Sequence, residues 1–153
     1  MRFWDASAVV ALCVEEDVSP AARGLLASDP GMAVWWATPV EVASALARLR
    51  RLSGIGVAEE QAARQVLSQY RQAWTEMQPS AALRDRAMRL LSVHELRAAD
   101  SLQLAAAVAW AGESREGRQF VCLDERLAGA ARREGFDVLP AAGHEPAFGP
   151  CGG

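Results

Sequence analysis

The chain contains no lysine, and all sixteen of its basic side chains are arginines. This absence excludes a P-loop nucleotide site and weighs against a receiver-type phosphoacceptor, because both use a lysine beside the phosphate. Cysteine is also scarce. The three cysteines are far apart and form no C-x-x-C pair, which argues against a disulfide framework and against a zinc site: Cys13, Cys122 and Cys151.

Long apolar runs are missing as well. The chain has no stretch of about 18 uninterrupted apolar residues, so we expect no membrane span. The first expected strand begins within three residues of the amino terminus, which leaves no room for a signal peptide, and we therefore expect a cytoplasmic protein. With 153 residues the chain has the size of one domain that buries roughly 70% of its unfolded surface.

The stretch Phe3-Trp4-Asp5-Ala6-Ser7 is the most informative part of the sequence. Two large apolar residues are followed at once by a carboxylate, a small residue and a hydroxyl. This order predicts a short buried strand whose carboxyl end delivers Asp5 to a strand-to-helix turn, with Ser7 opening the next helix as its cap.

Strands and helices alternate along the rest of the chain. Further strands are predicted at 32–36, 73–77, 120–123 and 137–139, and helices at 8–12, 20–27, 38–53, 58–72, 80–91, 97–110 and 126–134. This alternation predicts an α/β fold, with a central parallel sheet of four or five strands between two layers of helices. We expect one domain over residues 1–140 and a disordered tail over 141–153, which has glycines and prolines but no periodicity.

Four carboxylates are expected at one edge of this sheet. Asp5 and Asp124 follow strands, Glu41 lies in the first turn of the helix after the second strand, and Asp100 lies near the start of its own helix. Ligands of open α/β sheets bind beyond the carboxyl ends of the strands, where the strand order reverses. Two carboxylates about 4 Å apart repel by roughly 4 kcal/mol at an effective dielectric near 20, so such a cluster must hold protons or cations.

A ligand set made only of oxygens suits Mg²⁺ or Mn²⁺, which can orient a water and polarise a phosphodiester. The residues therefore favour a metal-dependent nuclease. Each carboxylate also has a structural alternative: Glu41 could complete a capping box with Thr38, Asp100 could favour the helix dipole, and Asp124 could cap its helix. Asp5 is harder to explain in this way, because Ser7 is already available as the cap. A phosphoacceptor domain or a non-catalytic interaction domain on the same scaffold stays open.

Together these motifs resemble the PIN-domain ribonucleases and, in size and layout, the VapC toxins. The similarity spans about residues 1–140 and depends on Asp5 with Ser7, on Glu41, on Leu96-Arg97-Ala98-Ala99-Asp100-Ser101 and on Asp124-Glu125-Arg126-Leu127. It implies a sheet ordered 3-2-1-4-5, Mg²⁺-dependent cleavage of single-stranded RNA or tRNA loops with Mn²⁺ able to substitute, a homodimer, and a cognate antitoxin. By position, Asp5 and Asp100 would be the principal metal ligands, and Glu41 and Asp124 would complete the catalytic cluster.

Cys122 departs from this resemblance, because the family often has a threonine or serine two residues before the last aspartate. We interpret Cys122 as a small core residue, with a hydroxyl-like contact near the site as the alternative. For the homodimer and the antitoxin we expect a docking face on the first helix, with Val9, Val10, Leu12 and Cys13, and on the antiparallel helix pair from Pro39 to Gln72. Two arginine clusters are interpreted as solvated helix faces, with a path for RNA backbone as the alternative: Arg48, Arg50 and Arg51, and Arg84, Arg86 and Arg89.

Overall fold

A computed structural model describes residues 1–141 of the chain. The predicted disordered tail, with Cys151, lies outside these residues from position 142 onward, so that expectation stays a prediction. None of the helices in the described residues has the length and apolar character of a membrane-spanning segment.

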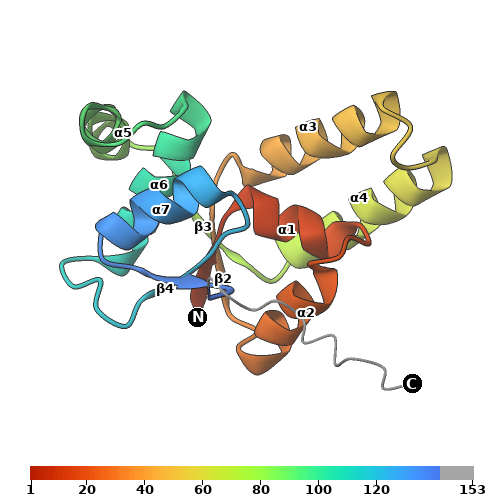
Figure 1. Cartoon of the computed structure of the whole chain (residues 1–153), viewed down its shortest axis with the longest axis horizontal. Coiled ribbons are helices and arrows are strands. Elements are labelled where there is room, and N and C mark those ends of the chain that lie inside the picture. Colours follow the sequence, from red (N-terminus) through yellow and green to blue (C-terminus); the bar gives the residue numbers. More distant parts are fainter. Residues whose placement is uncertain (142–153) are drawn as a thin grey trace, which may run out of the picture.

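Five short parallel strands form one sheet in the order β3-β2-β1-β4-β5, which confirms the predicted topology (Figure 1). The central strand is β1, where Phe3 pairs with Ala33 on one side and with Phe120 on the other. The strands are β1 Arg2–Trp4, β2 Met32–Trp35, β3 Thr75–Met77, β4 Gln119–Val121 and β5 Asp137–Leu139.

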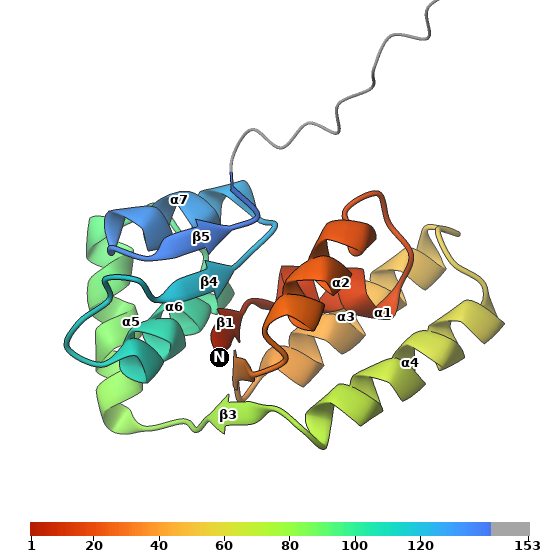
Figure 2. The same cartoon turned by 90° about the horizontal axis from the view of Figure 1, so that it is seen from below.

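Helices cover both faces of the sheet and complete the predicted three-layer α/β/α sandwich (Figures 1 and 2). Four of them lie on one face, where α3 and α4 run antiparallel and extend beyond the sheet: α1 Ala6–Cys13, α2 Ser19–Ser28, α3 Thr38–Arg51 and α4 Val57–Arg71. Three lie on the other face: α5 Ala81–Val93, α6 Ala98–Ala111 and α7 Glu125–Arg133.

The alternation of side chains along β1 builds both cores. Phe3 points into the core beneath α5, α6 and α7, where its ring stacks on Phe120 with centroids 5.5 Å apart. Trp4 points to the opposite face and packs in the core beneath α1 to α4. Because both residues are fully buried, β1 is held from both sides, and the position of its carboxyl end is fixed.

The ends of two helices differ from the prediction. Asp5, not Ser7, caps α1, and its carboxylate accepts a hydrogen bond from the backbone N–H of Ser7 at 3.1 Å. The helix begins at Ala6, directly after the strand, so Ser7 already lies inside it. The capping box of Thr38 and Glu41 does not form, because α3 begins one residue earlier, with Ala37 at the cap and no side-chain cap bond.

The expected docking face on the first helix is wrong. Val9, Val10 and Leu12 are buried in the core that α1 shares with α2, α3 and α4. The antiparallel pair α3–α4, which the prediction also counted as free surface, covers this helix. The pair itself does expose large apolar side chains, at Val40, Leu52 and Val57, and Trp36 is exposed just before α3.

Candidate active site

Asp5 lies where the strand order reverses, between β1 and β4. Its backbone N–H donates to the carbonyl of Val121 at 3.0 Å, which joins the ends of the two strands. The Ser7 hydroxyl donates to Asp5 Oδ2 and accepts from the backbone N–H of Leu123 at 3.0 Å. Ser7 therefore joins the loop after β1 to the loop after β4 and holds the Asp5 carboxylate between them.

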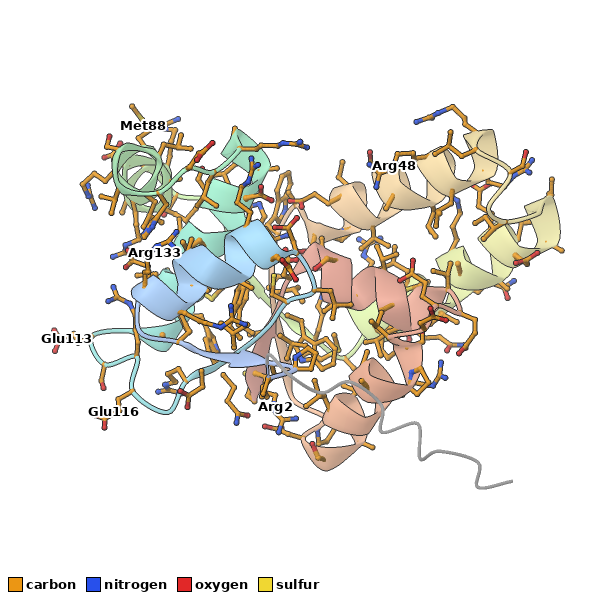
Figure 3. All side chains as sticks on the ribbon, in the orientation of Figure 1. Arg2, Arg48, Met88, Glu113, Glu116 and Arg133 are labelled. Atoms are coloured by element: carbon orange, nitrogen blue, oxygen red, sulfur yellow. The ribbon has the colours of Figure 1, made fainter. Side chains whose placement is uncertain are left out.

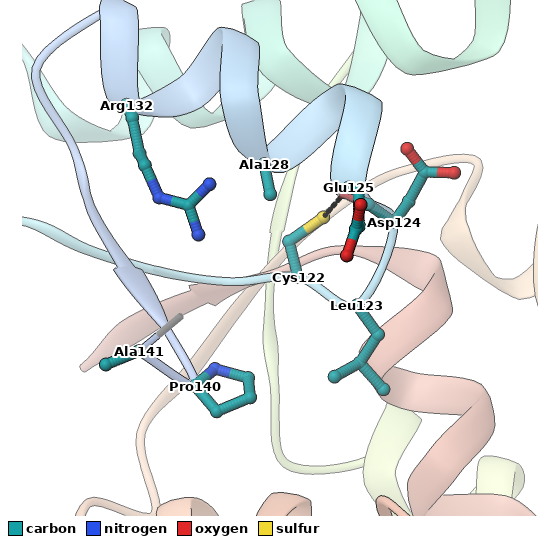
Figure 4. Close-up of a pocket in the computed structure, with 8 residues that line it drawn as sticks. All are labelled: Cys122, Leu123, Asp124, Glu125, Ala128, Arg132, Pro140 and Ala141. Carbon is teal, nitrogen blue, oxygen red and sulfur yellow. Dashed lines mark hydrogen bonds between the residues drawn. The ribbon is translucent and has the colours of Figure 1, made fainter. Parts of the chain in front are cut away.

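Cys122 also contacts this carboxylate. Its Sγ lies 3.5 Å from Asp5 Oδ2 and 3.3 Å from the carbonyl oxygen of Asp124, under the first turn of α7 (Figure 4). Burial, aided by the charge of Asp5, raises the pKa of the thiol, so Cys122 stays protonated and can donate. Both interpretations of Cys122 are thus partly correct, because the residue is buried and takes the place of a hydroxyl beside Asp5.

The acidic side chains of the crevice are poorly solvated. Asp5 is only 4% exposed, and burial raises its pKa above the usual range, although hydrogen bonds from Ser7 oppose the shift. Burial also raises the pKa of Glu41, to about 7, with a further contribution from the charges of Asp5 and Asp100. The pKa of Asp100 is raised by burial and by the charge of Asp124.

These charge effects show how the structure arranges the four predicted carboxylates. Glu41 is close enough to Asp5 and Asp100 for their charges to raise its pKa, and the charge of Asp124 raises the pKa of Asp100 in the same way. Asp124 caps α7 through a hydrogen bond of 2.8 Å from the backbone N–H of Leu127, as its structural alternative predicted. The four carboxylates are therefore successive neighbours along one crevice, from Asp5 through Glu41 and Asp100 to Asp124, and their catalytic role stays a prediction.

Two pockets open beside Asp124. One, of about 320 Å³, is lined by Asp100 and Asp124 together with Arg97 and Arg126. The other, of about 410 Å³, lies between α7 and the end of β5, with Arg132 on its wall (Figure 4). The crevice thus has basic groups at its rim, where an anionic substrate could approach its carboxylates.

Gln103 is a site residue that the sequence analysis missed. It is fully buried on α6, one turn after Asp100, and its Nε2 donates to Thr38 Oγ1 of α3 at 3.2 Å. The amide of Gln103 also opposes the rise in the pKa of Glu41. The only sequence signal was its spacing of three residues from Asp100, which places both side chains on one face of the helix.

The donor set fits a hard divalent cation. Carboxylate oxygens are the ligands that Mg²⁺ and Mn²⁺ prefer, and no positive side chain lowers the raised pKa values of Asp5 and Glu41. Within residues 1–141, no three His, Cys, Asp or Glu side chains lie close enough together to hold one metal ion. Since Mg²⁺ keeps several waters and needs only one or two carboxylates, pairs such as Asp5 with Glu41 would be sufficient.

Two solved structures share the fold of this chain. PAE2754 from Pyrobaculum aerophilum is 23% identical with a TM-score of 0.61, and the match covers 90% of this chain and 87% of that one. Mycobacterium tuberculosis VapC20, described as a sarcin-ricin loop cleaving toxin, is 18% identical with a TM-score of 0.63, over 90% and 97% of the two chains. No family model and no curated protein sequence matches the chain. The chain therefore shares its α/β fold with these two proteins.

The raised pKa of Glu41 predicts a pH dependence of stability. Between its ordinary value of 4.5 and about 7, the folded protein binds more protons than the unfolded chain, so stability should fall as the pH rises through this range. Urea unfolding in chelator should therefore show the wild type to be more stable at the acidic end. Glu41→Gln should flatten the profile, whereas Glu113→Gln, in an exposed loop far from the crevice (Figure 3), should not. Equal pH slopes in the wild type and Glu41→Gln would contradict the assignment.

The contacts of Cys122 predict how it tolerates a hydroxyl. Cys122→Ser should change the free energy of unfolding by less than about 1 kcal/mol, because two acceptors already face the side chain. Cys13→Ser is the matched control. It places a hydroxyl among apolar side chains beneath α1 and should lose more than about 1 kcal/mol. Similar losses in both variants, measured by urea unfolding, would show that Cys122 is only a core residue.

Proposed function

We propose that this protein is a metal-dependent endoribonuclease that acts as the toxin of a toxin–antitoxin pair. Its substrate would be single-stranded RNA or a tRNA loop, cleaved by attack of water on a phosphodiester. The observation that carries the proposal is the convergence of Asp5, Glu41, Asp100 and Asp124 on one crevice, with raised pKa values at the first three. The VapC-like fold supports it.

Three of the four carboxylates differ in their surroundings, which indicates different roles. Asp5 is held by Ser7 and Cys122, so it is a fixed group on which a cation could be placed. Glu41 has a pKa of about 7 and can therefore hold or release a proton near neutral pH, as a general acid or base must. Asp100 lies in a pocket with Arg97 and Arg126, whose guanidinium groups suit the phosphates on either side of the cleaved bond.

The cofactor in this proposal is Mg²⁺, with Mn²⁺ able to substitute, which a pair of carboxylates such as Asp5 with Glu41 would hold, with Asp100 and Asp124 nearby. When bound, the ion would polarise the phosphodiester and offset the mutual repulsion of the carboxylates. Gln103 would then act as a positioning residue, because its buried amide joins the second turn of α6 to the first turn of α3.

The partners in this proposal are an RNA substrate, a second copy of the chain and an antitoxin, all in the cytoplasm. Because α1 is buried, a partner would have to cover other apolar side chains, such as Trp36 and Val40, which are 50% and 67% exposed. Light scattering of the purified chain at tens of micromolar tests the homodimer, and only monomer there would exclude it at that concentration.

Removing one charge from the crevice separates the functional role of these carboxylates from a structural one. Asp100→Asn and Asp5→Asn keep the shape of the side chain and relieve repulsion. In chelator each variant should melt at the same temperature as the wild type or higher, because a buried carboxylate with a raised pKa destabilises the fold when it is charged. Added Mn²⁺ should raise the melting temperature of the wild type more than that of the variants, and RNA cleavage should be lost in both.

Asp85→Asn is the control, because Asp85 is exposed on α5 and should leave melting, Mn²⁺ binding and cleavage unchanged. If both crevice variants melt lower in chelator and Mn²⁺ does not stabilise the wild type, the carboxylates are structural and the nuclease proposal fails. Stabilisation by Mn²⁺ without RNA cleavage would instead indicate a metal-binding interaction domain.

A further inference from the structure

A second basic site lies at the far ends of the helices that carry the carboxylates. A pocket of about 250 Å³ is bounded by α5, the end of α6 and the end of α7. Three of its lining residues are arginines and only one is acidic: Arg86, Arg89, Arg115 and Glu134. Leu90, Val93 and Val108 form its apolar wall.

The single carboxylate does not neutralise these arginines. Glu134 Oε1 lies 2.7 Å from Nε2 of the buried His94, and its other oxygen is 3.9 Å from Arg115. The Nε of Arg115 is buried without a hydrogen-bond partner among the described residues. Among the described residues, the guanidinium groups of Arg86 and Arg89 also have no hydrogen-bond or ion-pair partner. The pocket therefore has guanidinium groups that are free to bind an anion.

Arg133 adds to this positive charge. It lies at the end of α7 near α5 (Figure 3), and its Nε donates to Nδ1 of His94 at 3.4 Å. Arg133 thus lies against one ring nitrogen of His94 and Glu134 against the other, so Glu134 Oε1 is already engaged. Only part of the predicted arginine cluster on α5 lines the pocket. Arg86 and Arg89 line it, whereas Arg84 is exposed and does not.

The location of the pocket indicates which anion it serves. α6 begins near Asp100 and reaches the pocket at Val108, eight residues later, which is about 12 Å along a helix. α7 begins at Asp124 and reaches it at Glu134. Arg97 and Arg126 stand at the carboxylate end of this path. One extended strand could therefore contact both ends, and planar guanidinium groups bind phosphate oxygens in pairs.

We propose that the pocket lined by Arg86, Arg89 and Arg115 binds a backbone phosphate of the RNA, away from the bond that is cleaved. The identity of the polyanion rests on the proposed function. A contact of this kind would add affinity and register without reading sequence, because phosphates carry no base information.

The test measures RNA binding without cleavage. A labelled oligouridine of about 16 nucleotides is titrated with the full chain in chelator, at several salt concentrations, and followed by fluorescence anisotropy. Arg86→Gln/Arg89→Gln should weaken binding about tenfold near 0.1 M salt, and should reduce the slope of log affinity against log salt by about 0.7, the contribution of one phosphate contact on a single strand.

The matched control is Arg48→Gln/Arg51→Gln, which removes the same number of charges from exposed positions on α3, far from the pocket (Figure 3). Arg50 is left intact because it pairs with Glu60. Equal losses in the two double variants would overturn the inference, since they would reflect net charge alone. Absence of RNA binding by the wild type would overturn it as well.

Two other occupants give different results. A site for free phosphate would let inorganic phosphate protect the wild type from thermal unfolding, with RNA affinity unchanged in Arg86→Gln/Arg89→Gln. If the pocket instead binds an acidic protein segment, Arg86→Gln/Arg89→Gln should no longer bind the antitoxin but should still bind RNA. Either result overturns the proposal. The failure of this proposal can be distinguished from the failure of the nuclease proposal. If Arg86→Gln/Arg89→Gln loses RNA binding but the wild type cleaves no RNA with Mg²⁺, the nuclease proposal fails and the phosphate pocket is supported. If the wild type cleaves RNA and the variant binds RNA normally, the phosphate pocket is wrong and the nuclease proposal is supported.

Discussion

The buried carboxylate of Asp5 is the constraint on which the rest of the crevice depends. The central strand ends in a core that is closed on both faces, so this group loses its hydration before any ligand arrives. Its donors are neutral, namely the hydroxyl and N–H of Ser7 and the thiol of Cys122, and no arginine pairs with it in the described residues. Because Glu41 adds a second poorly solvated carboxylate, charging both groups at once is unfavourable.

Much of the fold could be predicted because its elements differ in period and length. Short apolar runs such as Met32–Trp35 are buried on both faces, as strands of a parallel sheet must be, and each is followed by a longer amphipathic helix. The strand order came from the family resemblance, since no residue pattern shows which strands are neighbours. Helix ends were less predictable. A hydroxyl at Ser7 or Thr38 can cap only if the chain turns there, and the packing of β1 and β2 decides where it turns.

Residues of the candidate site also differ in how well the sequence predicts them. The acidic residues were visible because they interrupt apolar stretches at the ends of strands or the starts of helices. Gln103 was not, because glutamine in an alanine-rich helix is typical of a solvent-exposed position, and only the packing of α6 against α3 buries its amide. Cys122 was interpreted from its size, whereas its role depends on the distance to Asp5, which is 117 positions away in the sequence.

The absence of lysine gives these observations a common consequence. Every basic side chain except histidine is a guanidinium, which keeps its charge throughout the physiological range. The basic ends of α6 and α7 therefore cannot adapt to a ligand by changing protonation. The carboxylates of the crevice can, since burial has moved the pKa of Glu41 to about 7. The crevice at one edge of the sheet can thus change its charge near neutral pH, whereas the arginines of the pocket at the other end of the same helices keep theirs.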